Sequence, residues 1–163
     1  MEKELLNLSS LSFLKGCWYG TGLAQYPTIR AVEYREELNF LEMNTFNVLK
    51  YEQKTWVKSE EGLYNVPIFW ETGFLIERED YIELCNVQKN GRMEILTGKI
   101  IRLPDSELEI SFKSKEIFND AKMIKSGREF HLSPGEINYE LWMSTVNNPG
   151  YDIHLKASLS REE

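Results

Sequence analysis

The sequence predicts an all-β protein in which roughly ten antiparallel strands form one up-and-down barrel behind a short N-terminal helix. Apolar and polar residues alternate along most of the chain after Gly16, which is typical of strands with one buried face. Turn-forming pairs such as Asn90-Gly91 separate the alternating runs at the spacing found in barrels and sandwiches. Strands with one dry face must close or stack to cover their edges, and alternation alone is compatible with a barrel or a sandwich.

The helical segment is expected at Glu4–Lys15. Leu5, Leu8 and Leu11 follow an amphipathic spacing, and Gly16 is a natural stop for a helix. Because the segment is short, we expect two broken turns that plug one end of the barrel.

The alternation can be followed strand by strand. Between residues 31 and 40, the charged and polar side chains face away from an apolar row formed by Val32, Tyr34, Leu38 and Phe40. Glu36 falls in phase with this apolar row, which leaves open whether it is buried and paired or sits at a bulge. Similar rows recur at 107–112 and 137–143. The turn signals between rows are Glu61-Gly62, Asn90-Gly91, Pro104-Asp105, Ser126-Gly127 and Pro134-Gly135.

Length and composition predict a single globular domain over residues 1–163, with 42% apolar residues. The formal net charge is −7, and no cluster of Lys and Arg offers a surface for phosphates. We therefore expect neither nucleic acid nor a membrane as partner. No apolar run approaches the roughly 20 residues of a spanning helix, and the first residues lack the order of a signal peptide. A cytoplasmic location is expected.

The sequence contains two histidines and lacks the common catalytic and metal-binding motifs. It has no phosphate-binding glycine loop, no Gly-x-Ser-x-Gly elbow and no His-x-x-x-His pair. His131 lies near a hairpin tip and is expected to be exposed and idle. His154 lies where a loop enters a strand, a position from which a side chain can lean over the mouth of a barrel. Simple alternation, however, groups His154 with Lys156 and Ser158 on a polar face.

A family resemblance rests on two glycine-rich and aromatic segments. Residues 16–22, Gly-Cys-Trp-Tyr-Gly-Thr-Gly, are followed by Tyr26-Pro27-Thr28-Ile29, and together they resemble the signature of the nitrobindin family. Further matches keep their order from about residue 11 to residue 161. They include residues 34–37, 53–56, 71–74, 90–91 with Glu94, 128–130, 143–145, 148–149 and 154–157.

The nitrobindin resemblance implies a fatty-acid-binding-protein-like barrel that holds ferric haem b at its mouth. It implies His154 as the axial iron ligand and therefore as the metal-binding residue. It also implies reaction with nitric oxide, a diatomic ligand, and in some members isomerisation of peroxynitrite. The candidate haem contacts are Thr28, Ile68, Phe69, Trp70 and Met143.

The sequence departs from the nitrobindin pattern at three places near this site. Phe69 stands where the family usually has a histidine, the loop before His154 is one residue longer, and Arg92 replaces an apolar residue. A positive charge beside haem would need a propionate or a carboxylate partner. An alternative interpretation is a haem-free barrel that binds a fatty acid or another small apolar ligand. Phe69, its neighbour Trp70 and the longer loop before His154 favour this alternative.

Overall fold

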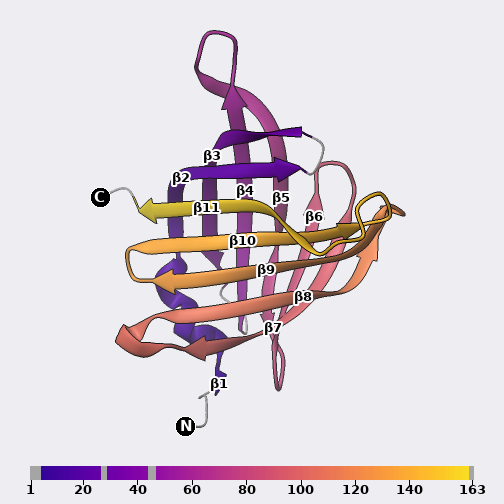
Figure 1. The fold of residues 1–163 in the computed structure, drawn as a ribbon. Helices are drawn as coiled ribbons and strands as arrows, with labels where there is room; N and C mark the ends of the chain where they lie inside the picture. Colours follow the sequence, from indigo (N-terminus) through magenta and orange to yellow (C-terminus); the bar gives the residue numbers. More distant parts are fainter. Residues whose placement is uncertain (1–4, 27–28, 44–46, 162–163) are drawn as a thin grey trace.

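The computed structural model, which describes residues 5–26, 29–43 and 47–161, is a closed antiparallel β-barrel (Figure 1). Neighbouring strands follow one another from β2 to β7, β2 also pairs with β11, and the second half runs from β11 back to β8. Pairing of β7 with β8 closes the wall, so the predicted barrel is confirmed and the sandwich is excluded. The long strands are β2 (Gly16–Tyr26), β3 (Ile29–Glu42), β4 (Val48–Lys58), β5 (Tyr64–Glu77), β6 (Ile82–Gln88), β7 (Met93–Arg102), β8 (Leu108–Phe118), β9 (Met123–Ser133), β10 (Glu136–Thr145) and β11 (Asp152–Arg161).

The N-terminal segment differs from the expected amphipathic helix. It is a 3-10 helix, η1 (Leu8–Leu14), preceded by a short strand, β1 (Leu5–Leu6), which pairs with β7. Within η1 the buried residues are Leu8, Leu11 and Leu14. Their spacing of three residues matches the three residues per turn of a 3-10 helix, so all three leucines point to the same side. This apolar edge plugs one end of the barrel, as predicted. A second 3-10 turn, η2 (Pro104–Ser106), links β7 to β8, and no helix among the described residues could span a membrane.

The glycines of β2 allow close packing against neighbouring groups. A Cβ atom on Gly20 would lie 2.0 Å from the carbonyl oxygen of Ser158, and one on Gly22 would lie 2.3 Å from Cζ of Tyr34. Both distances are far below van der Waals contact, so a larger residue would push β11 and the Tyr34 ring away. The glycine-rich segment therefore has a packing role.

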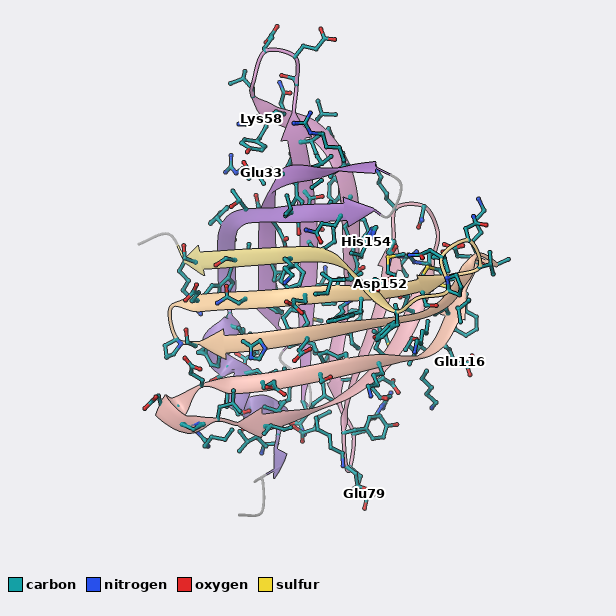
Figure 2. All side chains as sticks on the ribbon, in the orientation of Figure 1. Glu33, Lys58, Glu79, Glu116, Asp152 and His154 are labelled. Atoms are coloured by element: carbon teal, nitrogen blue, oxygen red, sulfur yellow. The ribbon has the colours of Figure 1, made fainter. Side chains whose placement is uncertain are left out.

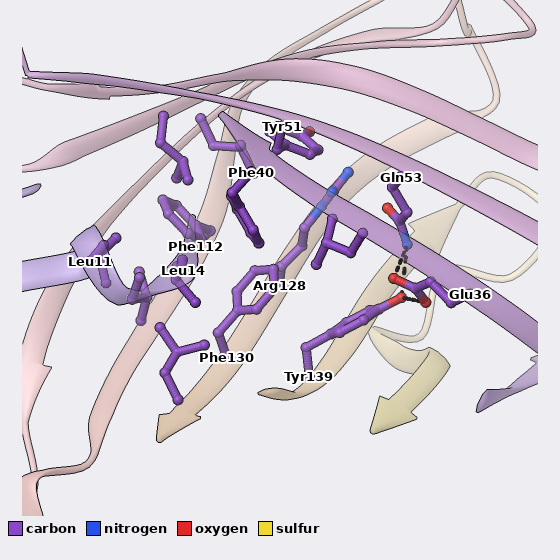
Figure 3. Close-up of a pocket in the computed structure, with 15 residues that line it drawn as sticks. Leu11, Leu14, Glu36, Phe40, Tyr51, Gln53, Phe112, Arg128, Phe130 and Tyr139 are labelled. Carbon is purple, nitrogen blue, oxygen red and sulfur yellow. Dashed lines mark hydrogen bonds between the residues drawn. The ribbon is translucent and has the colours of Figure 1, made fainter. Parts of the chain in front are cut away.

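The barrel interior is organised from the plugged end toward the opposite end. Next to η1 lies an apolar void of about 40 Å³, which is lined by Leu11, Leu14, Phe112 and Leu132 among others (Figure 3). Beyond it lies a polar layer, defined by the buried side chains of Glu36, Gln53, Glu71, Glu94, Arg128 and Tyr139. Beyond the polar layer the barrel opens.

Candidate functional site

The open end of the barrel contains a cavity of about 740 Å³. It is lined by the ends of β2, β4, β6 and β10 and by the beginnings of β3, β5 and β11, which is the end of the barrel opposite η1. The volume is within the range of about 300–1,000 Å³ that is usual for cofactor and ligand sites. The apolar lining residues include Ile68, Phe69, Leu141, Met143, Ile153 and Leu155.

His154 contributes to the cavity lining because β11 has an irregular register at this residue. In the pairing of β10 with β11, Leu141 lies opposite Leu155 and Trp142 lies opposite Ile153, so His154 is the extra residue of a β-bulge. A bulge interrupts the strict alternation of faces. His154 is therefore half-buried and lines the cavity, whereas Lys156 and Ser158 face outward as the alternation predicts. Figure 2 shows His154 at the beginning of β11.

A second bulge shapes the opposite wall of the cavity. Thr55 of β4 lies opposite Phe69 of β5, and the next residue, Trp56, lies opposite Pro67. Ile68 is therefore the extra residue, which explains why both Ile68 and Phe69 line the cavity although they are adjacent in sequence.

The environment of His154 favours a neutral imidazole. Burial lowers the pKa of His154, and the positive charge of Arg92 lowers it further. A hydrogen bond with the Gln25 backbone acts in the opposite direction and raises the pKa. Because only donation by the ring stabilises the charged form, the ring N–H donates to the Gln25 carbonyl oxygen. One ring nitrogen is thus committed to the main chain, which fixes the tautomer of the ring.

The other predicted haem contacts have different positions. Ile68, Phe69 and Met143 line the cavity. Trp70 does not, and its assignment as a wall residue is wrong because the register places it on the outer face. Its side chain is 46% exposed, and the ammonium of Lys54 lies 4.3 Å from the ring centroid. Thr28 lies outside the described residues, so its predicted contact stays a prediction.

Arg92 reaches the cavity from the turn between β6 and β7. One terminal nitrogen, Nη1, lies 3.3 Å from Oδ2 of Asp120 in the turn between β8 and β9. Asp120 is therefore the carboxylate partner that a charge at this position requires. The Nε atom of Arg92 is also buried, and it has no hydrogen-bond partner among the described residues.

Thr55 supplies another unpaired polar atom at the cavity. Its side chain is only 2% exposed, and its hydroxyl has no hydrogen-bond partner among the described residues. Burial of a polar group without a partner is unfavourable, so such a group at a cavity wall is well placed to bind a ligand.

Replacement of Thr55 by valine is expected to stabilise the ligand-free protein. The change keeps the shape of the side chain and removes a buried hydroxyl without a partner, a gain on the order of 1 kcal/mol. Urea unfolding measures it. Thr72→Val is the matched control, since the Thr72 hydroxyl donates a 3.0 Å hydrogen bond to the Tyr51 carbonyl and its loss should bring no gain. Destabilisation in Thr55→Val would mean that the hydroxyl has a partner.

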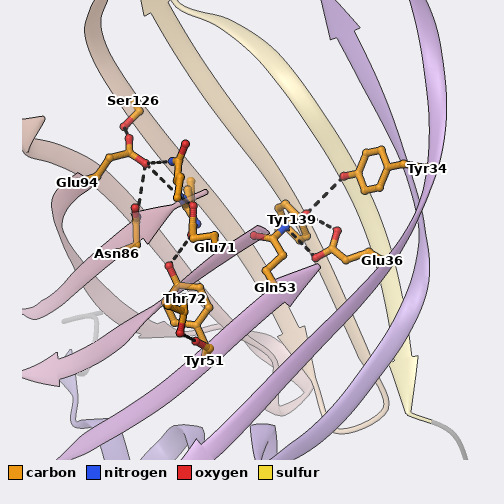
Figure 4. A network of polar contacts seen from close by, with 12 residues as sticks. Tyr34, Glu36, Tyr51, Gln53, Glu71, Thr72, Asn86, Glu94, Ser126 and Tyr139 are labelled. Atoms are coloured by element: carbon orange, nitrogen blue, oxygen red, sulfur yellow. Dashed lines mark hydrogen bonds and ion pairs between the residues drawn. The ribbon is translucent and has the colours of Figure 1, made fainter. Parts of the chain in front are cut away.

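Glu36 forms the part of the polar layer in which no cationic side chain among the described residues contacts the carboxyl group. Tyr139 Oη donates to the carboxyl at 2.5 Å, and Gln53 Nε2 donates to it at 3.0 Å (Figure 4). Complete burial raises the pKa of Glu36 to about 8, although both hydrogen bonds oppose this rise. Glu36 therefore holds a proton at neutral pH, and its hydrogen bonds connect through Tyr139 to the hydroxyl of Tyr34, 3.4 Å away. The ambiguity left by the sequence is resolved, because Glu36 is buried and hydrogen-bonded.

Glu36→Gln is expected to stabilise the protein progressively as pH rises. The pKa of Glu36 is about 8 in the folded protein, against 4.5 as its ordinary value. The folded state therefore binds the proton more tightly and loses stability as pH rises from about 4.5 to 8. Glutamine does not titrate, so the variant should gain on the order of 3 kcal/mol relative to the parent between pH 5.5 and 8. Thermal unfolding across this range measures the gain, and parallel pH profiles would contradict the raised pKa.

The second part of the polar layer is an ion-pair cluster around Arg128. The guanidinium of Arg128 contacts both carboxylate oxygens of Glu71, one of them at 2.8 Å, and lies 3.2 Å from Oε1 of Glu94. Burial acts to lower the pKa of Arg128, but the nearby Glu71 and Tyr51 hold this pKa well above its ordinary value. Burial likewise acts to raise the pKa of Glu94, and the charge of Arg128 with the hydroxyl of Ser126 lowers it overall. The cluster thus lies in the polar layer between the apolar core and the cavity at the open end.

His131 lies apart from the cavity. It is exposed, as predicted, on the outer face between Glu109 and Glu129, at 3.8 Å and 3.7 Å respectively. Ligand atoms of these three residues lie within 4.8 Å of one another, and exposed groups of this kind commonly form simple ion pairs.

Comparisons with known proteins agree with this architecture. A family described as "THAP4-like, heme-binding beta-barrel domain" matches residues 7–161. An Arabidopsis thaliana protein named peroxynitrite isomerase Rv2717c is 37% identical over 155 residues, which cover 94% of this chain and 88% of that protein. A Nocardia farcinica peroxynitrite isomerase is 34% identical and is aligned over 96% of this chain and 91% of its own length. A crystal structure of Rv2717c from M. tuberculosis has a TM-score of 0.84 and 28% identity, and the match covers 98% of this chain and 100% of the other.

Proposed function

This chain belongs to the THAP4-like, heme-binding β-barrel domains, the nitrobindin family, and we propose that it binds haem b at the open end of its barrel through His154. The further part of the proposal is that the haem iron is ferric and meets nitric oxide or a related reactive nitrogen species. Support for this part comes from the relatives that are named peroxynitrite isomerases.

The bulge at His154 carries the proposal. It brings into a cavity of about 740 Å³ an imidazole whose pKa is lowered and whose one ring nitrogen is committed to a main-chain acceptor. A neutral imidazole with a fixed tautomer is the form in which His154 would hold the haem iron. The apolar residues of the cavity suit a porphyrin, which is stabilised by removal of its faces from water. The residues present therefore fit the cofactor.

The protein would bind the haem, fix its orientation and shield it from water. His154 would hold the cofactor, and the Gln25 carbonyl oxygen would keep the ring in one orientation. Ile68, Phe69 and Met143 would exclude water from the cavity. Bound haem would supply the redox chemistry.

An absorption spectrum of the pure protein from haem-supplied cells tests the proposal. A Soret band and a native mass increased by one haem b are expected. Stopped-flow measurement of nitrate yield from peroxynitrite, with and without haem, then tests the isomerase activity. A native mass that shows a fatty acid or another apolar molecule instead of haem would favour the haem-free alternative.

A further inference from the structure

Arg92 brings an unusual combination of charge and burial to the cavity. Its side chain is only 11% exposed, yet it lines the cavity that contains His154. Two hydrogen bonds within the turn between β6 and β7 hold its backbone in place. The Gln88 N–H donates to the Arg92 carbonyl at 2.9 Å, and the Arg92 N–H donates to the Asn90 side chain at 3.0 Å. The position of this cation is therefore built into the fold.

The contact with Asp120 uses only part of the guanidinium. A single nitrogen, Nη1, lies 3.3 Å from one carboxylate oxygen, and the other oxygen of Asp120 accepts the backbone N–H of Lys122 at 3.1 Å. A guanidinium has five donors arranged in a plane. The Nε donor of Arg92 is buried and has no acceptor among the described residues. Nε belongs to the edge of the group that binds two oxygens of a planar anion side by side.

The other charged groups of the cavity are compatible with a bound anion. Among the described lining residues, Asp152 is the one carboxylate, and it is exposed to solvent. Asp120 is already occupied by Arg92 and by the Lys122 backbone. Apolar residues elsewhere in the cavity lining, such as Phe69 and Met143, lower the local polarity, which strengthens a charge-assisted hydrogen bond.

We propose that Arg92 forms a binding subsite for a small planar oxyanion of the nitrate class at the cavity. This inference deepens the proposed function and rests on it for its meaning, because peroxynitrite and nitrate are both small oxyanions. In that setting Arg92 would concentrate the anion beside the position that haem occupies and select planar oxyanions over halides.

Nitrate binding to the haem-free full-length protein tests the subsite directly. Sodium nitrate replaces sodium chloride at constant ionic strength, and the backbone amide signals of Asn90, Gly91 and Arg92 are followed by NMR. We expect saturable shifts in the parent protein. Arg92→Met should lack them, and Arg92→Lys, which keeps the charge and loses the planar fork, should bind nitrate roughly tenfold more weakly.

The matched control is Lys113→Met, which removes one positive charge from an exposed position on β8. Nitrate affinity in this variant should stay within about twofold of the parent, because an exposed and distant charge is screened. The same nitrate shifts in Arg92→Met, or equal affinities in the parent and Arg92→Lys, would overturn the proposal.

The remaining outcomes separate the subsite from the haem proposal. Weaker haem binding in Arg92→Met, with no nitrate response in the haem-free parent, would assign Arg92 to a haem carboxylate and overturn the subsite. A normal nitrate response in a parent protein that fails to bind haem would overturn the proposed function and leave the subsite in place.

Discussion

His154→Ala is expected to abolish the Soret band at haem concentrations that saturate the parent protein. Loss of a residue that merely orients a metal ligand costs about 10–100-fold in affinity, and loss of the ligand itself should cost at least as much. His154 is the histidine at the cavity, whereas His131 lies on the outer face. Spectrophotometric titration with haem measures the change.

Two controls make the His154 result specific. His131→Ala should keep the band, because it removes a histidine that is outside the cavity. Added imidazole should restore the band in His154→Ala, since the small ligand can enter the space left by the side chain. A band that persists unchanged in His154→Ala would exclude this residue as the ligand. In the parent, the lowered pKa of His154 should preserve the band somewhat below pH 6.5, because the imidazole remains neutral there.

Arg128→Met is expected to produce the largest loss of stability. Arg128 is 4% exposed and is the cation that contacts Glu71 and Glu94, which are 0% and 2% exposed. Removal of one partner from a buried ion pair leaves an uncompensated charge and costs about 3–5 kcal/mol. This is a large share of the roughly 5–15 kcal/mol by which a typical domain is stable. Denaturant unfolding measures the loss, and a decrease in Tm of roughly 10 °C is expected.

Removal of the buried carboxylate that Arg128→Met leaves without a partner should restore much of the lost stability. Adding Glu71→Gln to Arg128→Met replaces one buried carboxylate by a neutral amide, so the double variant should be more stable than Arg128→Met alone. Arg35→Met, at an exposed position on β3, should change stability by less than about 0.5 kcal/mol. Equal losses in Arg128→Met and Arg35→Met would mean that the buried cluster contributes little.

The sequence predicted the architecture well because alternation reports directly which face of a strand is buried. Val32, Tyr34 and Leu38 were placed in phase, and Tyr34 and Leu38 are buried whereas Val32, near the open end, is 37% exposed. The prediction of an amphipathic helix at Glu4–Lys15 was less accurate, because leucines three residues apart fit a 3-10 helix as well as an α-helix.

The site was harder to predict because two bulges govern it. Alternation assumes a constant period of two, so it placed His154 on the wrong face, and its position where a loop enters a strand and the family resemblance were what pointed to it. In Pro67-Ile68-Phe69-Trp70 several apolar residues are consecutive, which conceals that Trp70 faces outward. Nothing in the sequence distinguishes Thr55 from the other threonines as a candidate site residue. The absence of a hydrogen-bond partner becomes visible only once the strands are paired.

The acceptor that orients His154 has a consequence for how this protein tolerates mutation. The ring is held by the main chain at position 25 rather than by a side chain. Any amino acid at that position supplies the same carbonyl oxygen, so evolutionary drift there cannot delete the interaction. The orientation depends instead on the alignment of β2 with β11, where Ala24 lies opposite Leu155. The imidazole geometry is therefore vulnerable to insertions or deletions within these strands and to substitutions that displace β11, such as a larger residue at Gly20.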